Sequence, residues 1–176
     1  PMTAISTTPS DIEPLCQLAR FAFDWAPSLC DPTHGCTDYH RSWSAIRLFS
    51  LDAAVPAGWP FFHRQLQALA EGNPAPRVLI SGGADTGLMA IVASAYAGTG
   101  VMPEVIFTDR CATTVEQNRL YAKHLGLNAS FLVGDIRSLD CPPVDAVVAH
   151  SFLIFFDEES RRQVVANWGR LLKPGG

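Results

Sequence analysis

The sequence predicts an α/β protein with a Rossmann-like parallel sheet, flanking helices and a helical N-terminal extension. Beyond residue 76, short β-rich segments alternate with helix-length segments, as in parallel strands joined by right-handed helical crossovers. A glycine-rich turn follows the first β-rich segment. Before residue 73 the apolar residues recur at helical spacing instead. Pro74 and Pro76 separate the two regions, so we expect a helical extension over 1–73 and the sheet domain over 74–176.

The N-terminal region is predicted to contain three helices. Ser10 and Glu13 fit a capping box, and apolar residues then recur at helical spacing as far as Trp25. A loop is expected over 27–38, followed by helices over 39–51 and 61–71.

The C-terminal region is predicted to contain four strands and three helices. The β-rich segments are 77–81, 104–109, 129–133 and 144–149. The helical segments between and after them are 88–97, 113–125 and 158–172.

Composition narrows the class of protein. The chain has 176 residues, 48% hydrophobic and 17% charged, which suits one folded domain with an extension and excludes intrinsic disorder. Its net charge of −4, without a stripe of Lys or Arg, disfavours a nucleic-acid partner. The apolar run 144–156 is shorter than a bilayer span and contains Asp145 and His150, so no membrane segment is expected. With no signal-peptide pattern and five cysteines that lack a C-x-x-C pair, we expect a cytoplasmic protein.

The segment from Val78 to Gly87 carries the most chemical information. A buried strand that runs into a glycine-rich turn and then a helix lets backbone approach a ligand and directs free helix N–H groups toward it. The turn is not a P-loop, because no Gly-Lys-Ser/Thr follows, and its glycines at 82, 83 and 87 do not match G-x-G-x-x-G. A tight strand-to-helix turn also needs glycine for structural reasons alone.

Acidic residues follow the next two strands. Asp109 ends the second strand, where a carboxylate can accept two hydrogen bonds from a ribose diol; the alternative is a helix N-cap. Asp135 and Ile136 follow the third strand, where an acid can accept from an exocyclic amine and an apolar side chain can cover an adenine; the alternative is an ordinary turn. The carboxyl ends of parallel strands share one edge, so these features would line one crevice.

In these features the chain resembles the class I S-adenosylmethionine-dependent methyltransferases over 77–176. Residues 78–87 are similar to the family's first motif, 144–150 to its fourth-strand motif, and 171–176 (Leu-Leu-Lys-Pro-Gly-Gly) to the turn before its fifth strand. The resemblance implies S-adenosylmethionine as cofactor. It also implies cofactor contacts from Ser81, Gly82, Gly83, Asp85, Gly87, Asp109, Arg110, Asp135, Ile136 and His150.

Two departures from the family pattern matter. Ser81 stands where the family usually has an acid, and we expect Asp85 to take over the methionine amino group. The sequence also stops just before the expected fifth strand, as a truncated domain would. The fourth strand would then be an exposed edge, which favours pairing with another chain, and a homodimer is one expectation.

Methyl transfer depends mainly on orientation and desolvation, with a general base for a hydroxyl or amine acceptor. His150, at the end of the fourth strand, is the first candidate base; alternatively it orients the loop or contacts the cofactor. His40 is the second. It shares a helix face with Tyr39 and Trp43, whose rings suit a sulfonium and are predicted to contact substrate. Core packing is the alternative for this face.

A group of residues in the N-terminal region has metal-ligand chemistry. Cys30, His34, Cys36 and His40 are spaced C-x3-H-x-C-x3-H. This spacing lacks the paired knuckle of structural zinc sites, so we expect free thiols and no metal.

The sequence therefore predicts an S-adenosylmethionine-dependent methyltransferase that acts on a small molecule by O- or N-methylation. A non-catalytic S-adenosylmethionine-binding module is one alternative. An NAD(P)-dependent oxidoreductase is another, because Asp109 could also hold an NAD ribose, although the glycine spacing and the C-terminal Lys-Pro-Gly-Gly disfavour it.

Overall fold

The computed structural model describes residues 16–49, 51 and 59–176, and its centre is a parallel four-stranded sheet. The strand order is β3-β2-β1-β4. The strands are β1 (Arg77–Ser81), β2 (Glu104–Asp109), β3 (Ala129–Val133) and β4 (Ala146–Val148). This is the α/β architecture that the alternating pattern predicts, and the first three strands begin and end where the sequence places them.

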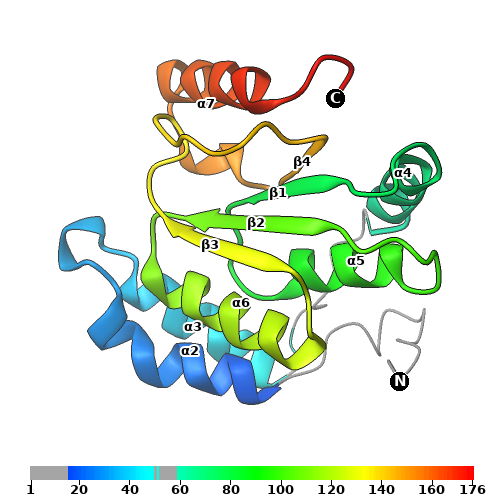
Figure 1. The fold of residues 1–176 in the computed structure, drawn as a ribbon. Coiled ribbons are helices and arrows are strands. Elements are labelled where there is room, and N and C mark those ends of the chain that lie inside the picture. The colour runs from blue at the N-terminus through cyan, green and yellow to red at the C-terminus, as the bar shows by residue number, and fades with distance from the viewer. Residues whose placement is uncertain (1–15, 50, 52–58) are drawn as a thin grey trace.

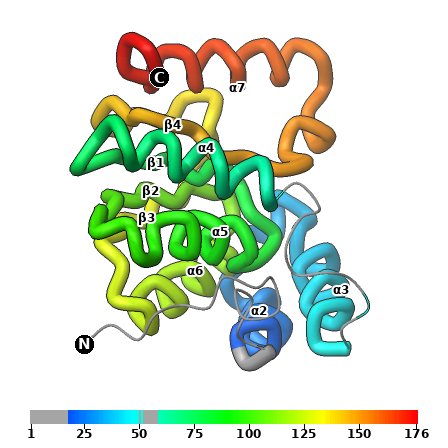
Figure 2. Tube along the Cα trace, turned by 90° about the vertical axis from the view of Figure 1, so that its right-hand side faces the viewer, coloured from blue at the N-terminus to red at the C-terminus, as the bar shows by residue number. Residues whose placement is uncertain are grey.

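Helices cover both faces of the sheet (Figure 1). One face carries α4 (Trp59–Gly72), α5 (Gly87–Tyr96) and α6 (Ala112–Leu125), and the other carries α7 (Glu158–Leu171). Figure 2 shows α7 on the opposite side of the sheet from α5 and α6. Alternate strand residues point to opposite faces. Val78 and Ile80 accordingly pack into the core under α5, while Leu79 packs with Val164 and Leu171 of α7.

The N-terminal extension consists of α2 (Cys16–Leu29), a short 3-10 turn η1 (Pro32–His34) and α3 (Thr37–Leu48). Helix α2 packs against α3 and α6. The Gln117 side-chain amide of α6 donates to the Leu18 carbonyl oxygen at 3.1 Å. The extension therefore lies against the outer side of α6, below the sheet in Figure 1.

Several predicted boundaries are wrong. The helices expected over 39–51 and 61–71 are Thr37–Leu48 and Trp59–Gly72, and at the end of α2 tertiary contacts override the local signal. The loop expected from residue 27 begins later, since α2 continues through Pro27 to Leu29. Ala26 and Cys30 are buried beside Cys111, and this packing supports a last turn that Pro27 leaves one N–H short. The capping box at Ser10 and Glu13 lies outside the described residues.

The fourth strand is shorter than predicted. It covers 146–148, and Val144 instead forms an isolated parallel bridge with Leu172, just after α7. The Val144 N–H donates to the Leu171 carbonyl oxygen, and the Lys173 N–H donates to the Val144 carbonyl oxygen, both at 2.9 Å.

The strand order places a topological switch beside β1. The chain passes from β1 to β2 to β3 in one direction and then returns to β4 on the other side of β1. In open α/β sheets, ligands bind outside the carboxyl ends of the strands at such a switch. No described helix is both long and apolar enough to cross a lipid bilayer.

Candidate functional site

The glycine turn after β1 is held close to β2. Gly82 has φ +76°, and its N–H donates to the Thr108 carbonyl oxygen at 2.8 Å. A Cβ atom at Gly82 would lie 2.3 Å from the Phe152 ring. Glycine is therefore required here both for the left-handed backbone and for the close approach of Phe152.

Asp109 sits at the carboxyl end of β2, next to this turn. Its Oδ1 accepts the Cys111 N–H at 2.8 Å, and its Oδ2 accepts the Gly83 N–H at 3.3 Å. Burial raises the pKa of Asp109, against the opposing effect of these N–H groups. Cys111, not Asp109, is the N-cap residue of α6. A carboxylate offers about four acceptor sites, so Asp109 keeps acceptor capacity for a ligand.

Asp85 connects the turn to the extension. Its Oδ1 accepts the Gly87 N–H at 2.7 Å, at the start of α5. Its Oδ2 accepts the Trp43 indole N–H at 2.9 Å and lies 3.0 Å from Nε of Arg47. The structure thus pairs Trp43, predicted to contact substrate, with a predicted cofactor residue. A contact between Asp85 and a methionine amino group stays a prediction, and Asp85 would make it beside these partners.

Helix α3 also brings Tyr39 to this edge of the sheet. Burial raises the pKa of the Tyr39 hydroxyl, and the charges of Asp85 and Asp109 raise it further. The Tyr39 ring packs edge-on against Phe155 at 5.8 Å between centroids. Phe155 belongs to η2 (Leu153–Phe155), which follows β4. The extension therefore reaches from the β1 turn to the segment after β4.

The two candidate bases differ sharply in environment. His150 is exposed, with its ring 6.4 Å from that of Phe62, and it lies two residues beyond Val148, which pairs with Ile80 of β1. It is therefore level with Gly82. His40 is only 6% exposed, and burial, together with the Arg110 charge, lowers its pKa to about 4. A histidine with so low a pKa is a weak base at neutral pH.

The turn after β3 places its two predicted residues differently. The Asp135 carboxylate accepts from Nε of Arg137 at 3.0 Å, and this guanidinium lowers the pKa of Asp135. Ile136 is buried against α7, where its carbonyl oxygen accepts from the Asn167 amide at 2.6 Å. Arg110 is exposed; its charge partly opposes the rise in the pKa of Asp109 and adds a small part to the lowering of the pKa of Asp135. The adenine contact of Ile136 stays a prediction, with the side chain in the core.

Ser81 faces the opposite side of the sheet from the extension. It is fully buried, and its hydroxyl accepts from the Trp168 indole N–H of α7 at 3.0 Å. A mainly apolar hollow of about 590 Å³ opens nearby between β4 and α7, with Val147, Phe152 and Trp168 in its lining. The lining of the hollow includes neither a residue of the glycine turn nor Asp109.

Sequence reasoning missed two residues of this region. Phe155 lies in an aromatic run after His150, which could have indicated a role at the edge of the sheet. Cys111 follows Asp109 by two residues and lies 3.5 Å, sulfur to sulfur, from Cys30. The side-by-side position of these cysteines depends on how α2 packs, and no local pattern signals it.

The chain matches one protein family over its C-terminal half. The sequence profile described as "Methyltransferase domain" matches residues 82–176, more than half of the chain. No curated protein sequence matches.

Solved structures with a similar fold are also methyltransferases. Magnesium protoporphyrin IX methyltransferase (ChlM) from Synechocystis PCC 6803, with bound SAM, has TM-score 0.51 and 18% identity over 65% of this chain and 54% of that chain. The mitomycin 7-O-methyltransferase MmcR has TM-score 0.56 and 18% identity over 88% of this chain and 41% of that chain. TrmN from Thermus thermophilus has TM-score 0.50 and 28% identity over 65% of this chain and 35% of that chain. The chain thus spans about half or less of the length of these proteins.

Proposed function

Since the chain belongs to the methyltransferase domain family, we propose that it binds S-adenosylmethionine beside the glycine turn and methylates a small molecule. The family membership confirms the resemblance and the fold that the sequence predicts. One observation carries the proposal furthest: the Gly83 N–H donates to the Asp109 carboxylate, joining the two predicted cofactor segments at the topological switch.

The residues at this edge fit the proposed cofactor. Asp109 would accept hydrogen bonds from the ribose hydroxyls, because each of its oxygens has acceptor capacity beyond the N–H it already holds. Asp135, held by Arg137, would accept from the adenine amine. The cofactor supplies a methyl group already activated by a sulfonium charge. The carboxylates of Asp85 and Asp109 and the ring of Tyr39 would favour that positive charge at this edge.

His150 is the proposed general base. It is exposed at the end of β4, so an acceptor can reach its imidazole. His40 fits this role poorly, because it is buried and its pKa is lowered to about 4. With a hydroxyl or amine acceptor, His150 would take the proton as the methyl group is transferred, and O- or N-methylation is the reaction we propose.

The proposed acceptor is a small apolar or aromatic molecule. Tyr39 and Phe155, which contact each other across this edge, are 40% and 62% exposed, and Ile154 beside them is 69% exposed. Such rings bind flat apolar surfaces. Two of the solved relatives are named for small-molecule acceptors, protoporphyrin and mitomycin. The net charge of −4 disfavours a nucleic-acid acceptor, and we propose a cytoplasmic location as the site of action.

Calorimetric titration with S-adenosylhomocysteine, and with NADH in parallel, tests the cofactor. We expect the first ligand alone to bind. Asp109→Ala should weaken it about 10- to 100-fold, because a hydrogen bond to a charged group contributes roughly 1.5–3 kcal/mol. Asp24→Ala, which removes an exposed acid of α2, is the matched control and should leave the affinity unchanged.

Three outcomes would contradict parts of the proposal. Binding of NADH alone would favour the oxidoreductase reading. Equal affinity of the parent and Asp109→Ala would remove the ribose assignment. Tight binding without methyl transfer to any acceptor in a screen of apolar phenols and amines would favour a non-catalytic module.

A further inference from the structure

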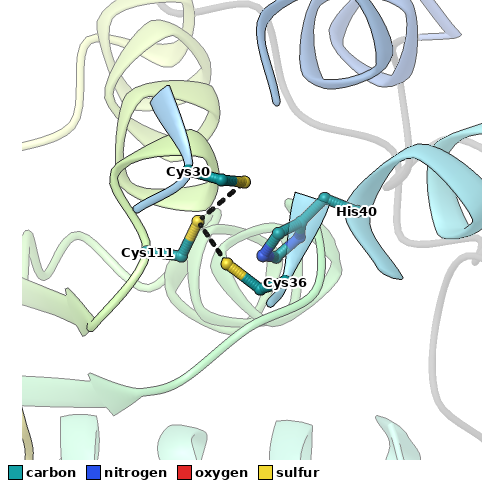
Figure 3. A group of neighbouring side chains, drawn as sticks. All are labelled: Cys30, Cys36, His40 and Cys111. Carbon is teal, nitrogen blue, oxygen red and sulfur yellow. Dashed lines mark hydrogen bonds between the residues drawn. The ribbon is translucent and has the colours of Figure 1, made fainter. Parts of the chain in front are cut away.

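Four side chains with metal-binding chemistry meet where the extension contacts the β2–α6 turn (Figure 3). Cys30 follows α2, Cys36 precedes α3, His40 lies in the first turn of α3, and Cys111 precedes α6. Their ligand atoms, three sulfurs and one ring nitrogen, all lie within 4.8 Å of one another. The sulfur of Cys111 lies 3.5 Å from that of Cys30 and 3.7 Å from that of Cys36.

These distances match the coordination shell of a single ion. A Zn–S bond is about 2.3 Å long, and two ligands at the corners of a tetrahedron are about 1.6 bond lengths apart, or about 3.8 Å. The observed sulfur separations of 3.5 and 3.7 Å are close to this value. A disulfide would need a sulfur separation of about 2.0 Å. A set of three thiolates and one imidazole is a common shell of structural zinc.

The histidine supplies a second, independent indication. His40 is only 6% exposed, and its Nδ1 is buried without a hydrogen-bond partner in the described part of the chain. Buried polar atoms are almost always paired, so an unpaired imidazole beside three thiols points to a partner that is not protein.

We propose that Cys30, Cys36, His40 and Cys111 bind one divalent zinc-type ion in a structural site. Four protein ligands fill a tetrahedral shell and leave no open position for a substrate, so the site is structural and not catalytic. The Thr113 hydroxyl lies 3.2 Å from the Cys30 sulfur, where it can donate to a thiolate.

This site differs from the ligand group seen in the sequence. His34 lies in η1 and is not part of the cluster, and Cys111 from the other region takes the fourth place. Cys36 and His40 are four residues apart on α3, where the His40 N–H donates to the Cys36 carbonyl oxygen at 3.0 Å, so one helical turn presents both ligands. The expectation of metal-free thiols rested on local spacing, and we replace it with this proposal.

The metal would link the extension to the sheet domain at the turn that follows Asp109. The Cys111 N–H donates to the Asp109 carboxylate, so a metal ligand and the proposed ribose acid share one short turn. The proposed site stands independently of methyl transfer, since its four ligands are present whatever binds at Asp109.

Metal analysis of the purified protein tests the proposal. The chain should be prepared without nickel affinity chromatography and analysed by inductively coupled plasma mass spectrometry. We expect one zinc per chain, and replacement by Co²⁺ should give the intense visible absorption of a tetrahedral, thiolate-bound ion. Cys36→Ser and Cys111→Ser should each lose the stoichiometric metal. Cys141→Ser, which changes a half-buried thiol outside the cluster, is the matched control and should retain it.

The cobalt spectrum keeps the test decisive even if the cysteine variants fail to fold, because it uses the unsubstituted chain. Reduced protein that neither contains zinc nor binds added Zn²⁺ or Co²⁺ would overturn the proposal. A Cys30–Cys111 disulfide in the protein as isolated, seen by non-reducing peptide mapping, would overturn it in favour of a redox pair. An octahedral cobalt spectrum without thiolate charge-transfer bands would also overturn it.

Discussion

Replacing Asp85 with alanine should destabilise the fold by about 3–5 kcal/mol, because it removes one member of a buried ion pair with Arg47. The Asp85 and Arg47 side chains are 13% and 5% exposed and lie 3.0 Å apart, Oδ2 to Nε. The same carboxylate oxygen accepts the Trp43 indole N–H at 2.9 Å. Alanine would therefore remove an ion-pair contact of Arg47 and a hydrogen bond of Trp43 in one step.

The size of the effect follows from the burial. An exposed ion pair contributes only about 0–1 kcal/mol, but removing one partner of a buried pair costs about 3–5 kcal/mol because the remaining charge is desolvated. For a chain of 150–250 residues, each kcal/mol lowers Tm by about 2–4 °C, so a fall of about 6–20 °C is expected. Glu158→Ala, which breaks an exposed pair with Arg162, is the matched control and should lower Tm by only a few degrees at most, on the order of 1 kcal/mol.

Urea denaturation and thermal melts, followed by circular dichroism, give the free energy of unfolding for each variant. The double variant Arg47→Met/Asp85→Ala also removes the cation that loses this carboxylate, and it should recover part of the loss. A cost below about 1 kcal/mol for Asp85→Ala, or a double variant no more stable than the single one, would refute the reasoning. If folded Asp85→Ala binds S-adenosylhomocysteine with unchanged affinity, the proposed contact between Asp85 and the amino group of the methionine moiety is ruled out.

Three further substitutions have defined outcomes. Gly82→Ala should cost about 2–4 kcal/mol in urea denaturation, because an L residue at φ +76° is strained and its Cβ would meet the Phe152 ring at 2.3 Å. Burial alone would raise the pKa of Asp145, but the Arg77 N–H and the Lys173 ammonium outweigh it and lower the pKa below 3.8. The stability that Asp145 contributes is therefore complete above that pH and lost as pH falls further, and Asp145→Asn should flatten the acid limb of stability against pH. His150→Asn should lower turnover about 10²- to 10⁴-fold while cofactor affinity changes little; equal losses would instead indicate a cofactor contact.

The fold was largely predictable because its signals are local. The continuous β-rich runs in 77–81 and 104–109, ended by a glycine turn and by Asp109, predict strand boundaries that the structure reproduces. The boundary errors occur where contacts with segments far away in the sequence determine where a strand begins or a helix ends. β4 begins later than predicted because Val144 pairs with Leu172, and α2 continues past Pro27 because its last turn packs beside Cys111.

The candidate site was predictable only on the sheet side. Strand ends at one edge bring the glycine turn and Asp109 together whatever the rest of the chain does. The partners that α3 supplies depend on how the extension docks, which spacing within a helix does not specify. Helical spacing groups Trp43 with Tyr39 and His40, but it does not predict the hydrogen bond from Trp43 to Asp85, 42 residues away. Cys111 is likewise 75 residues from Cys36. The local spacing of cysteines and histidines therefore groups His34 with the other three residues and misses Cys111.

The extension is tied to the sheet domain at residues that immediately follow the two cofactor strands. The Arg47 and Trp43 contacts end on Asp85 after β1, and the proposed metal ligands end on Cys111 after β2. Detaching α3 would therefore remove the α3 contacts of the Asp85 carboxylate, which lies at the N-terminus of α5. It would also loosen the turn in which the Cys111 N–H holds Asp109. A ligand that needs Asp109 in this position must therefore bind more tightly when the extension is docked. By thermodynamic linkage the effect is reciprocal: the metal and the ion pair increase the affinity for the ligand by the same factor by which the ligand stabilises the metal site and the ion pair. The extension thus contributes to the proposed cofactor site through the positions of Asp85 and Asp109, even where its own side chains do not touch the ligand.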